Sequence, residues 1–263
     1  MAEAEPMVQE RTSNATTSDE LAGQVVLVTG GARGLGAQIA EAAMLRGATA
    51  IVCDLREDAA QACASKLESM RGPQGKGRAY AIGLDVGDDA QVRDVINRVV
   101  GREGRLDAVI NNAAIDITVP VDELEAKDWE RIVQTNLTGP FYIARHAAKV
   151  MRERGSGHIV NIASTASKRA WPNASAYHAT KWGLLGLSHA LHAELRPYGV
   201  KVTAIVSGGM RTPFLLDRFP DIDLQNLMDP AHVAKTVMFV LGTPAEVVVP
   251  EVMILPMRET SWP

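Results

Sequence analysis

The chain has 263 residues, of which 46% are hydrophobic and 22% charged, a composition ordinary for a soluble globular protein and sufficient for one large α/β domain. Its formal net charge is −4, and the absence of a dense basic stretch argues against a nucleic-acid partner. No apolar run approaches the ~20 residues of a membrane span, and the N-terminus lacks the residue order of a signal peptide. We therefore expect a cytoplasmic protein with no membrane partner.

The domain organisation follows from the distribution of apolar residues. Residues 1–20 are polar and lack apolar periodicity, which predicts a disordered N-terminal tail followed by a single domain over 21–263. The two cysteines, Cys53 and Cys63, show no metal-ligand spacing. We expect two reduced, buried thiols and no metal site.

Short β-branched runs alternate with longer helical patterns from Val25 onward, which is typical of βαβ units. The predicted strands are Val25–Thr29, Thr49–Asp54, Ala79–Asp85, Ala108–Asn111, His158–Ala163, Lys201–Val206 and Val252–Leu255. The predicted helices are Leu35–Arg46, Glu57–Met70, Asp89–Glu103, Lys127–Glu153, Ala176–Arg196 and Pro230–Leu241. Since crossovers between parallel strands are right-handed, this order predicts an α/β fold, a doubly wound, seven-stranded parallel sheet with helices on both faces.

A glycine-rich turn, Thr29-Gly-Gly-Ala-Arg-Gly-Leu-Gly36, follows the first strand, and a helix begins within it. Glycines let backbone N–H groups approach a pyrophosphate, and the helix N-terminus adds partial positive charge. The spacing is G-x-x-x-G-x-G, so it matches the general dinucleotide fingerprint by mechanism and not by pattern. Tight strand–helix packing is the alternative interpretation. The candidate phosphate-side residues are Gly30, Arg33, Gly34, Leu35 and Gly36.

Asp54 ends the second strand, about 20 residues after this turn. A carboxylate there can accept hydrogen bonds from both hydroxyls of an adenosine ribose and would repel a 2′-phosphate, which favours NAD over NADP. Two alternatives stay open. Asp54 could be a solvated strand-end residue, and Arg33 could bind a 2′-phosphate if the carboxylate turns away.

Tyr177 and Lys181 stand four residues apart in a helical stretch, so their side chains share one helix face. An ammonium close to a phenol is expected to lower the phenol pKa from ~10 toward the range that a general acid or base needs. The same spacing is also common in pairs that serve only the helix surface.

Taken in order, several segments resemble the short-chain dehydrogenase/reductase family over residues 22–257. The segments are Thr29–Gly36, Asn111-Asn-Ala-Ala114, Asn136, Ser164 and Tyr177-x-x-x-Lys181. The resemblance implies a single-domain Rossmann oxidoreductase that interconverts a secondary alcohol and a ketone with a nicotinamide cofactor.

The resemblance also implies a role for each catalytic candidate. Tyr177 transfers the proton, and Ser164, thirteen residues earlier, hydrogen-bonds the reacting oxygen. Lys181 also contacts the nicotinamide ribose. Asn136 kinks its helix and holds a water that links Lys181 to solvent. Thr165 and Ser167 are nearby competitors of Ser164.

On the cofactor side, the resemblance assigns Asn112 and Ala113 to the adenosine wall, and Asp85 and Val86 to the adenine ring. Turn chemistry could also explain the first pair, and a helix cap could explain Asp85.

After the sixth strand, the chain reads Ser207-Gly208-Gly209-Met210-Arg211-Thr212 where the family usually has Pro-Gly-x-x-x-Thr. Serine in place of proline predicts a less stiff loop, while Gly208 and Thr212 are still expected near the nicotinamide carboxamide. A group of apolar residues forms either a substrate wall or lid-to-core packing. Its members are Trp171, Phe214, Leu215, Leu216 and Phe219.

Three functional hypotheses follow. The first is an NAD-dependent oxidoreductase acting on a small-molecule alcohol or ketone. The second is an NADPH-dependent reductase of 3-oxoacyl thioesters of the acyl-carrier-protein type, with Arg33 at the 2′-phosphate. The third is a non-catalytic dinucleotide-binding sensor. The resemblance further implies a homodimer or homotetramer formed through helices Lys127–Glu153 and Ala176–Arg196.

Overall fold

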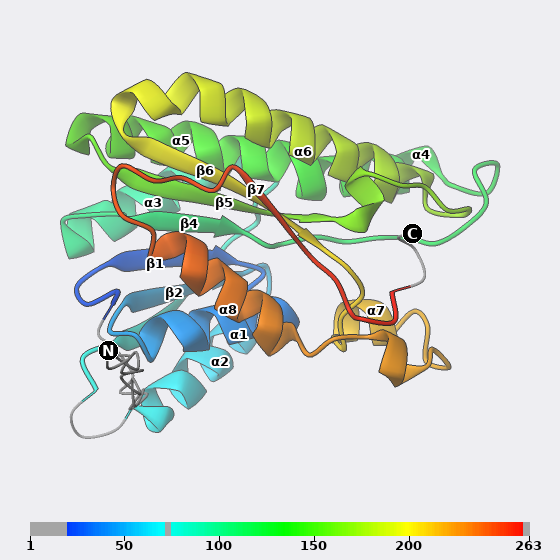
Figure 1. The fold of residues 1–263 in the computed structure, drawn as a ribbon, viewed down its shortest axis with the longest axis horizontal. Coiled ribbons are helices and arrows are strands. Elements are labelled where there is room, and N and C mark those ends of the chain that lie inside the picture. The colour runs from blue at the N-terminus through cyan, green and yellow to red at the C-terminus, as the bar shows by residue number, and fades with distance from the viewer. Residues whose placement is uncertain (1–19, 72–74, 260–263) are drawn as a thin grey trace, which may run out of the picture.

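The computed structural model describes residues 20–71 and 75–259, so the predicted N-terminal tail lies almost entirely outside the described residues. Seven parallel strands form one sheet in the order β3-β2-β1-β4-β5-β6-β7 (Figure 1). They are β1 (Val25–Thr29), β2 (Thr49–Asp54), β3 (Arg78–Gly83), β4 (Ala108–Asn111), β5 (Gly157–Ser164), β6 (Val200–Ser207) and β7 (Glu251–Ile254). The predicted doubly wound, seven-stranded parallel sheet is confirmed.

Helices cover both faces of the sheet (Figure 1). The α-helices are α1 (Gly34–Met44), α2 (Glu57–Met70), α3 (Asp89–Glu103), α4 (Ala126–Val133), α5 (Gly139–Arg154), α6 (Ser175–Leu195), α7 (Pro213–Leu216) and α8 (Pro230–Leu241). The side chains of α1, α2 and α8 pack into one apolar cluster, and those of α3 and α5 into another on the opposite face. None of the helices in the described part of the chain has the length and apolarity that crossing a bilayer requires.

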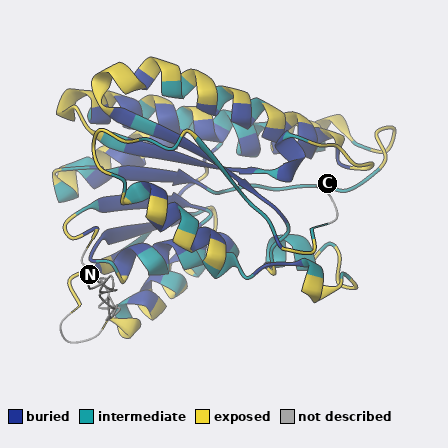
Figure 2. Cartoon of the chain, in the orientation of Figure 1, coloured by how far each residue is buried: buried dark blue, intermediate teal, exposed yellow. Residues whose placement is uncertain are grey.

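Strand β1 shows why the sequences of the strands are continuous runs of apolar residues. Val26 and Val28 pack into the cluster with α1, whereas Val25 and Leu27 pack into the cluster with α3 and α5. Because successive side chains of a strand point to opposite faces, a strand covered on both sides must be apolar at every position. The strands are accordingly the most buried part of the molecule (Figure 2).

The helix predicted over Lys127–Glu153 is interrupted in the structure. α4 ends at Val133, a π-helical segment follows over Gln134–Thr138, and α5 continues from Gly139 without a break in the chain. Such single π-turns occur frequently at functional sites, and this one contains Asn136. The kink expected at Asn136 therefore takes the form of a π-turn.

Ser207 belongs to the sheet and not to the following loop. It is the last residue of β6, it is buried, and it lies opposite Ser164 in the register of β5 and β6. Its hydroxyl donates to the carbonyl oxygen of Ala163 at 3.5 Å. The loop whose stiffness serine was expected to reduce therefore begins one residue later, at Gly208.

The thiol prediction is confirmed for Cys53 and only partly for Cys63. Both cysteines are free; Cys53 is fully buried in β2, whereas Cys63 on α2 is half-buried. Burial raises the pKa of the Cys53 thiol to about 12, with a smaller contribution from the neighbouring Asp54 carboxylate. Cys53 is therefore a core residue and not a reactive thiol.

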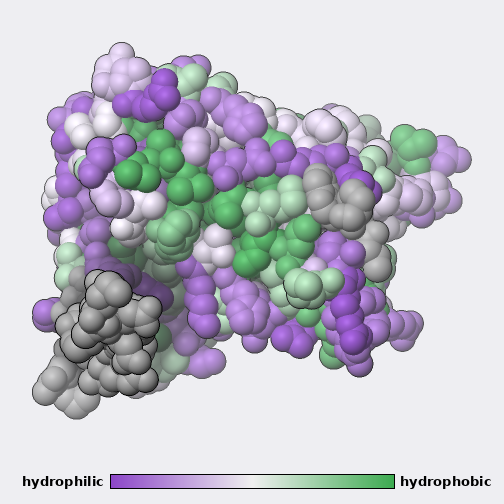
Figure 3. Space-filling view, viewed as in Figure 1, coloured by the Kyte–Doolittle hydropathy of each residue, from purple (hydrophilic) through white to green (hydrophobic). Residues whose placement is uncertain are grey.

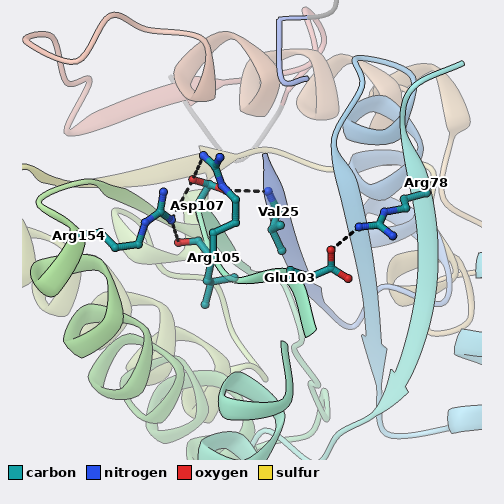
Figure 4. A network of polar contacts seen from close by, with 7 residues as sticks. Val25, Arg78, Glu103, Arg105, Asp107 and Arg154 are labelled. Atoms are coloured by element: carbon teal, nitrogen blue, oxygen red, sulfur yellow. Dashed lines mark hydrogen bonds and ion pairs between the residues drawn. The ribbon is translucent and has the colours of Figure 1, made fainter. Parts of the chain in front are cut away.

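At the end of the sheet away from the carboxyl termini of the strands, a network of polar contacts is centred on Asp107 (Figure 4). Its carboxylate accepts hydrogen bonds from the Val25 N–H at 2.8 Å, from Arg105 at 2.7 Å, and from Arg154 at 3.2 Å. Burial alone would raise the pKa of Asp107, but the bonds to Arg105 and Val25 and the two positive charges outweigh it and lower the pKa. The network joins β1 and α5 to the segment that precedes β4.

Candidate active site

The site lies where the strand order reverses, between the carboxyl ends of β1 and β4. From β1 the chain crosses toward β2, and from β4 it crosses the other way toward β5, so a crevice opens between them. A cavity of about 860 Å³ lies there. Most of the predicted site residues line it: Gly30, Arg33, Gly34, Leu35, Asp54, Asp85, Val86, Asn112, Ala113, Ser164, Tyr177, Lys181, Gly208 and Thr212. Gly36 and Asn136 do not.

The glycines of the turn after β1 are required by geometry. Gly30 and Gly34 have φ angles of +59° and +57°, which side-chain-bearing residues rarely adopt. A Cβ on Gly36 would lie 2.2 Å from the carbonyl oxygen of Gly30, so a side chain there would push α1 off the turn. Both interpretations of the turn therefore apply: Gly36 serves strand–helix packing, while Gly30 and Gly34 open onto the cavity.

Hydrogen bonds from the β4 side hold the same turn. The Thr29 hydroxyl donates to the carbonyl oxygen of Ile110 at 3.2 Å and accepts from the N–H groups of Asn112 and Ala113, each at 3.1 Å. The Asn112 amide donates to the carbonyl oxygens of Thr29 and Gly30 at 2.9 and 3.0 Å. Asn112 thus shapes the crevice wall through bonds to the backbone.

We call the part of the cavity beside Asp54 its outer end and the part beside Tyr177 its inner end. At the outer end, Asp54 and Arg33 have different partners. The Asp54 carboxylate accepts from the N–H groups of Ala32 and Arg56, each at 3.2 Å. Arg33 is exposed and forms an ion pair at 3.3 Å with Asp217, which follows α7. The Asp54 carboxylate is therefore held at the turn, while the Arg33 guanidinium is directed toward Asp217.

Asp85 and Val86 lie on the opposite side of this outer end. The Asp85 carboxylate accepts from the N–H of Gly87 at 2.8 Å, so part of its role is to hold the turn before α3. Val86 packs so closely on Gly139 that a Cβ there would lie 2.8 Å from the valine methyl group. Together they give this wall one carboxylate and one apolar surface.

Tyr177 meets Ser164 at the inner end of the cavity. Tyr177 lies in the first turn of α6, and Ser164 is the last residue of β5. Burial raises the pKa of Tyr177 to about 12; the hydrogen bond to the Ser164 side chain and the charge of Arg218 lower it, and the charge of Asp116 raises it. The expectation that Lys181 lowers this pKa is wrong, because desolvation of the phenolate outweighs the favourable contacts.

Lys181 is buried one helical turn after Tyr177. Its Nζ lies 5.6 Å from the centre of the Tyr177 ring and donates to the carbonyl oxygen of Ile162 at 2.7 Å. Burial lowers the pKa of Lys181 to about 8, against an opposing effect of Asp116. The sequence correctly placed the two side chains on one face, but the ammonium bonds to the backbone of β5 and not to the phenol.

Asn136 lies behind this pair, outside the cavity lining. Its amide is fully engaged: it accepts from the Ile115 N–H and donates to the Ile115 carbonyl oxygen, both at 2.8 Å, and donates to the Thr180 hydroxyl at 3.3 Å. It therefore ties the π-turn to the loop after β4 and to α6.

The sequence offered two alternatives to Ser164. Ser167 is buried and donates to the Ser164 carbonyl oxygen, while Thr165 lines the cavity.

Four of the five predicted apolar wall residues line the cavity, namely Trp171, Phe214, Leu215 and Phe219; Leu216 does not. The Phe214 ring lies 5.8 Å from the Tyr177 ring. Trp171 is held by His178, whose Nε2 accepts from the Trp171 N–H at 3.1 Å. The substrate-wall interpretation is thereby favoured for all but Leu216.

Five charged wall residues in the described part of the chain were not among the sequence candidates, namely Arg56, Asp116, Arg131, Arg218 and Glu259. Asp116 and Arg218 form an ion pair in the inner part of the cavity, and the Glu259 carboxylate accepts from the Gly209 N–H at 3.2 Å. Asp116 could have been suspected, because it follows a strand end at the crevice. Nothing local marks Arg218 or Glu259, whose positions depend on the course of the chain after β6 and β7.

Comparison with known proteins agrees with this geometry. The model of the short chain dehydrogenase family matches residues 24–223. The chain is therefore a member of the short-chain dehydrogenase/reductase family, oxidoreductases that act on CH–OH groups with a nicotinamide dinucleotide.

Individual relatives cover most of the chain. The 2-dehydro-3-deoxy-L-rhamnonate dehydrogenase (NAD(+)) of Sphingomonas sp. (strain SKA58) is 36% identical over 76% of this chain and 76% of its own. The crystal structure of levodione reductase has a TM-score of 0.83 at 29% identity and covers 90% of this chain and 97% of its own. A metagenomic short-chain oxidoreductase in complex with NADP has a TM-score of 0.79 at 26% identity, covering 90% and 99%.

The residues of the crevice fit a dinucleotide. Gly30 and Gly34 leave no side chain between the backbone and the cavity, Asp54 offers a carboxylate at the outer end, and Lys181 offers an amine at the inner end. Both ends open onto the same cavity, so an elongated ligand can contact them together.

The cost of burying Lys181 gives the first testable prediction. Because its folded pKa of about 8 lies below the ordinary 10.5, the unfolded chain binds more protons between these values, and wild-type stability rises with pH there. Lys181→Met lacks this titration. We expect the stability of Lys181→Met relative to wild type to fall by about 2–3 kcal/mol between pH 7 and pH 10, measured by urea unfolding without cofactor.

The matched control is Lys149→Met, which removes an exposed lysine from α5. Its stability relative to wild type should stay constant over the same pH range. A difference for Lys181→Met that is constant or grows with pH would contradict the buried-amine interpretation.

Proposed function

We propose that the chain interconverts a small secondary alcohol and its ketone, with NAD as the preferred cofactor and Tyr177 as general acid and base. The observation that carries this proposal is the hydrogen-bonded pair of Ser164 and Tyr177 on the wall of the cavity, with Lys181 buried behind it. A non-catalytic sensor would have no need to keep a buried phenol and a buried amine together beside a serine hydroxyl.

The nicotinamide cofactor would supply or accept the hydride. Gly30, Gly34, Asp54, Lys181 and Gly208 would hold it, since all five open onto the cavity.

The proton and the orientation come from the chain itself. The Ser164 oxygen accepts from the Ala166 N–H at 3.1 Å, so its own hydrogen faces Tyr177 and would be donated to a substrate oxygen that binds between the two hydroxyls. With a pKa of about 12, Tyr177 is a neutral phenol at neutral pH and is ready to donate a proton to the oxygen of a ketone. In the oxidative direction the phenol would first have to lose its proton, and the resulting phenolate would accept the proton of the alcohol.

Lys181 and Asn136 would support this transfer. A lysine with a pKa of about 8 exchanges protons near neutral pH and can return one to Tyr177. We assign Asn136 a positioning role, because its bonds to Ile115 and Thr180 fix the π-turn against α6.

Two contacts support a preference for NAD. Asp54 lines the outer end of the cavity with its carboxylate fixed by two N–H groups, and a carboxylate there repels a 2′-phosphate. Arg33, which the acyl-thioester alternative would use to bind that phosphate, is paired with Asp217. The first hypothesis is therefore favoured over an NADPH-dependent reductase.

Replacing the general acid tests the reaction itself. Tyr177→Phe keeps the ring contact with Phe214 but removes the hydroxyl group that donates the proton. We expect kcat to fall by about 10²–10⁴-fold, with the affinity for NADH nearly unchanged. The measurements are turnover of a panel of secondary alcohols and ketones and a fluorescence titration with NADH. Tyr198→Phe is the matched control, because that tyrosine is exposed. Unchanged turnover in Tyr177→Phe would refute the mechanism.

Removing the outer carboxylate tests the cofactor preference. Asp54→Ala should lower the ratio of kcat/KM with NAD to that with NADP by about tenfold or more, because repulsion of the 2′-phosphate is lost. Asp58→Ala removes an exposed carboxylate from the first turn of α2 and should leave the ratio unchanged. A wild-type enzyme that prefers NADP would contradict the proposal.

We also propose that the chain is a homodimer or homotetramer. Large apolar side chains are exposed on the helices implied by the family resemblance: Trp129 on α4, Phe141 on α5 and Trp182 on α6. On the face drawn in Figure 3, apolar side chains also gather where α8 and the segment before β7 lie, and exposed Phe239 and Val247 belong to these elements. Two such faces would suffice for a tetramer.

Light scattering tests this assembly. We expect a mass of two or four chains for the wild type and a smaller assembly for Phe141→Glu/Trp182→Glu, because charges would be buried at the interface. Leu45→Glu places the same charge at an exposed position after α1 and should leave the mass unchanged. A monomeric wild type would overturn the proposal.

A further inference from the structure

An ion pair between Asp116 and Arg218 stands in the inner part of the cavity, beside Tyr177. Asp116 lies in the segment after β4, and Arg218 follows α7; the two are 102 residues apart in the sequence. Arg218 also donates to the Thr118 hydroxyl at 3.2 Å and to the Phe214 carbonyl oxygen at 2.9 Å. Both members of the pair line the cavity.

The pair is separated from Tyr177 by a single aromatic ring. The guanidinium carbon of Arg218 lies 4.4 Å from the centre of the Phe214 ring, and that ring lies 5.8 Å from the ring of Tyr177. The charges reach the catalytic groups, since Asp116 raises the pKa of both Tyr177 and Lys181. A substrate whose oxygen meets Tyr177 would therefore extend toward this pair.

The pair is not satisfied by the protein. The Asp116 side chain is 4% exposed, and its Oδ1 has no hydrogen-bond partner within the described residues. Arg218 uses Nε and Nη1, while no partner of its Nη2 is found in residues 20–71 and 75–259. Burial raises the pKa of Asp116 although Arg218, a backbone hydrogen bond from Ile117 and the nearby His178 lower it, so the desolvation of this carboxylate is only partly compensated.

An anchor for α7 would not need this arrangement. Apolar contacts usually replace a buried ion pair without loss of stability, and a buried oxygen with no partner adds to the cost. The neighbouring ion pair between Asp217 and Arg33 already holds the same segment from the exposed side. The unused acceptor and donor of Asp116 and Arg218 therefore point to a ligand group.

The charges select the kind of group. A carboxylate would be repelled by Asp116, and an ammonium would be repelled by Arg218 and Lys181. A hydroxyl both donates and accepts, so it can donate to Oδ1 of Asp116 and accept from Nη2 of Arg218. Because Oδ1 is buried in the structure, the bond to it requires the Asp116 carboxylate to become accessible from the cavity that it lines.

We propose that Asp116 and Arg218 bind a second hydroxyl group of the substrate, so that the preferred substrate is a diol or larger polyol and not a plain secondary alcohol. This inference rests on the proposed alcohol–ketone activity. Asp116 and Arg218 are then specificity-determining residues.

The wild-type enzyme gives the first test. With NAD, kcat/KM is measured for cyclohexanol, for the 1,2-, 1,3- and 1,4-cyclohexanediols, and for 4-hydroxycyclohexanecarboxylate. We expect at least one diol to exceed cyclohexanol by about tenfold or more, because a site built around a hydroxyl strongly rejects an analogue that lacks it. The inference is overturned if cyclohexanol equals or exceeds every diol, or if the carboxylate is preferred.

Variants separate recognition from anchoring. Asp116→Asn and Arg218→Met should each lower the ratio of kcat/KM for the preferred diol to that for cyclohexanol by about tenfold, mainly by raising KM for the diol, because a change in the pKa of Tyr177 or Lys181 would affect both substrates alike and cancel in the ratio. Asp217→Asn breaks the adjacent ion pair to Arg33 and should leave the ratio unchanged. An equal loss with both substrates in Asp116→Asn and Arg218→Met would show an anchoring role and overturn the inference.

The two proposals can fail separately. Turnover of cyclohexanol without preference for any diol would leave the alcohol–ketone activity standing and refute only the role of Asp116 and Arg218. Absence of turnover for every alcohol and ketone of the panel would refute both.

Discussion

The hydrogen bonds around Thr29 are the interaction on which the rest of the site depends. The Thr29 hydroxyl makes three hydrogen bonds to the backbone, one to Ile110 in β4 and two to the residues that follow this strand, and the Asn112 amide donates two bonds to the carbonyl oxygens of Thr29 and Gly30. This fastens the carboxyl ends of β1 and β4 together at the point where the strand order reverses. Since Gly30 and Gly36 allow no side chain there, the crevice has a fixed floor, and every wall residue is placed relative to it.

Burial sets the chemistry of the inner end. Tyr177 and Lys181 are both desolvated, so the phenol pKa rises to about 12 and the amine pKa falls to about 8. The two pKa values thereby move apart from their ordinary 10.0 and 10.5, and burial favours the neutral form of each group, the phenol and the amine. Desolvation of these two side chains where α6 packs on β5 lowers the folding stability, as is common at active sites.

Local patterns in the sequence were sufficient for the fold and for most of the site. Tyr177 and Lys181 were correctly placed on one helix face, and the glycine turn was correctly placed at the crevice, because helix periodicity and strand–turn–helix order are local properties. The predicted direction of the Tyr177 pKa was wrong, since the spacing reveals the ammonium but not the degree of desolvation. Asn136 was correctly assigned to a kink, but its amide bonds the backbone of Ile115, a contact that its position in the sequence does not reveal.

By itself, the sequence determined the seven strands, their parallel doubly wound arrangement and the residues at their carboxyl ends, because each depends on periodicity and connection rules within short segments. Only the tertiary structure decided which charges meet. Asp116 pairs with Arg218 across 102 residues, and Arg33 pairs with Asp217 across 184. Such pairs depend on where the segment after β6 folds back over the crevice, and that course is set by packing among elements distant in sequence.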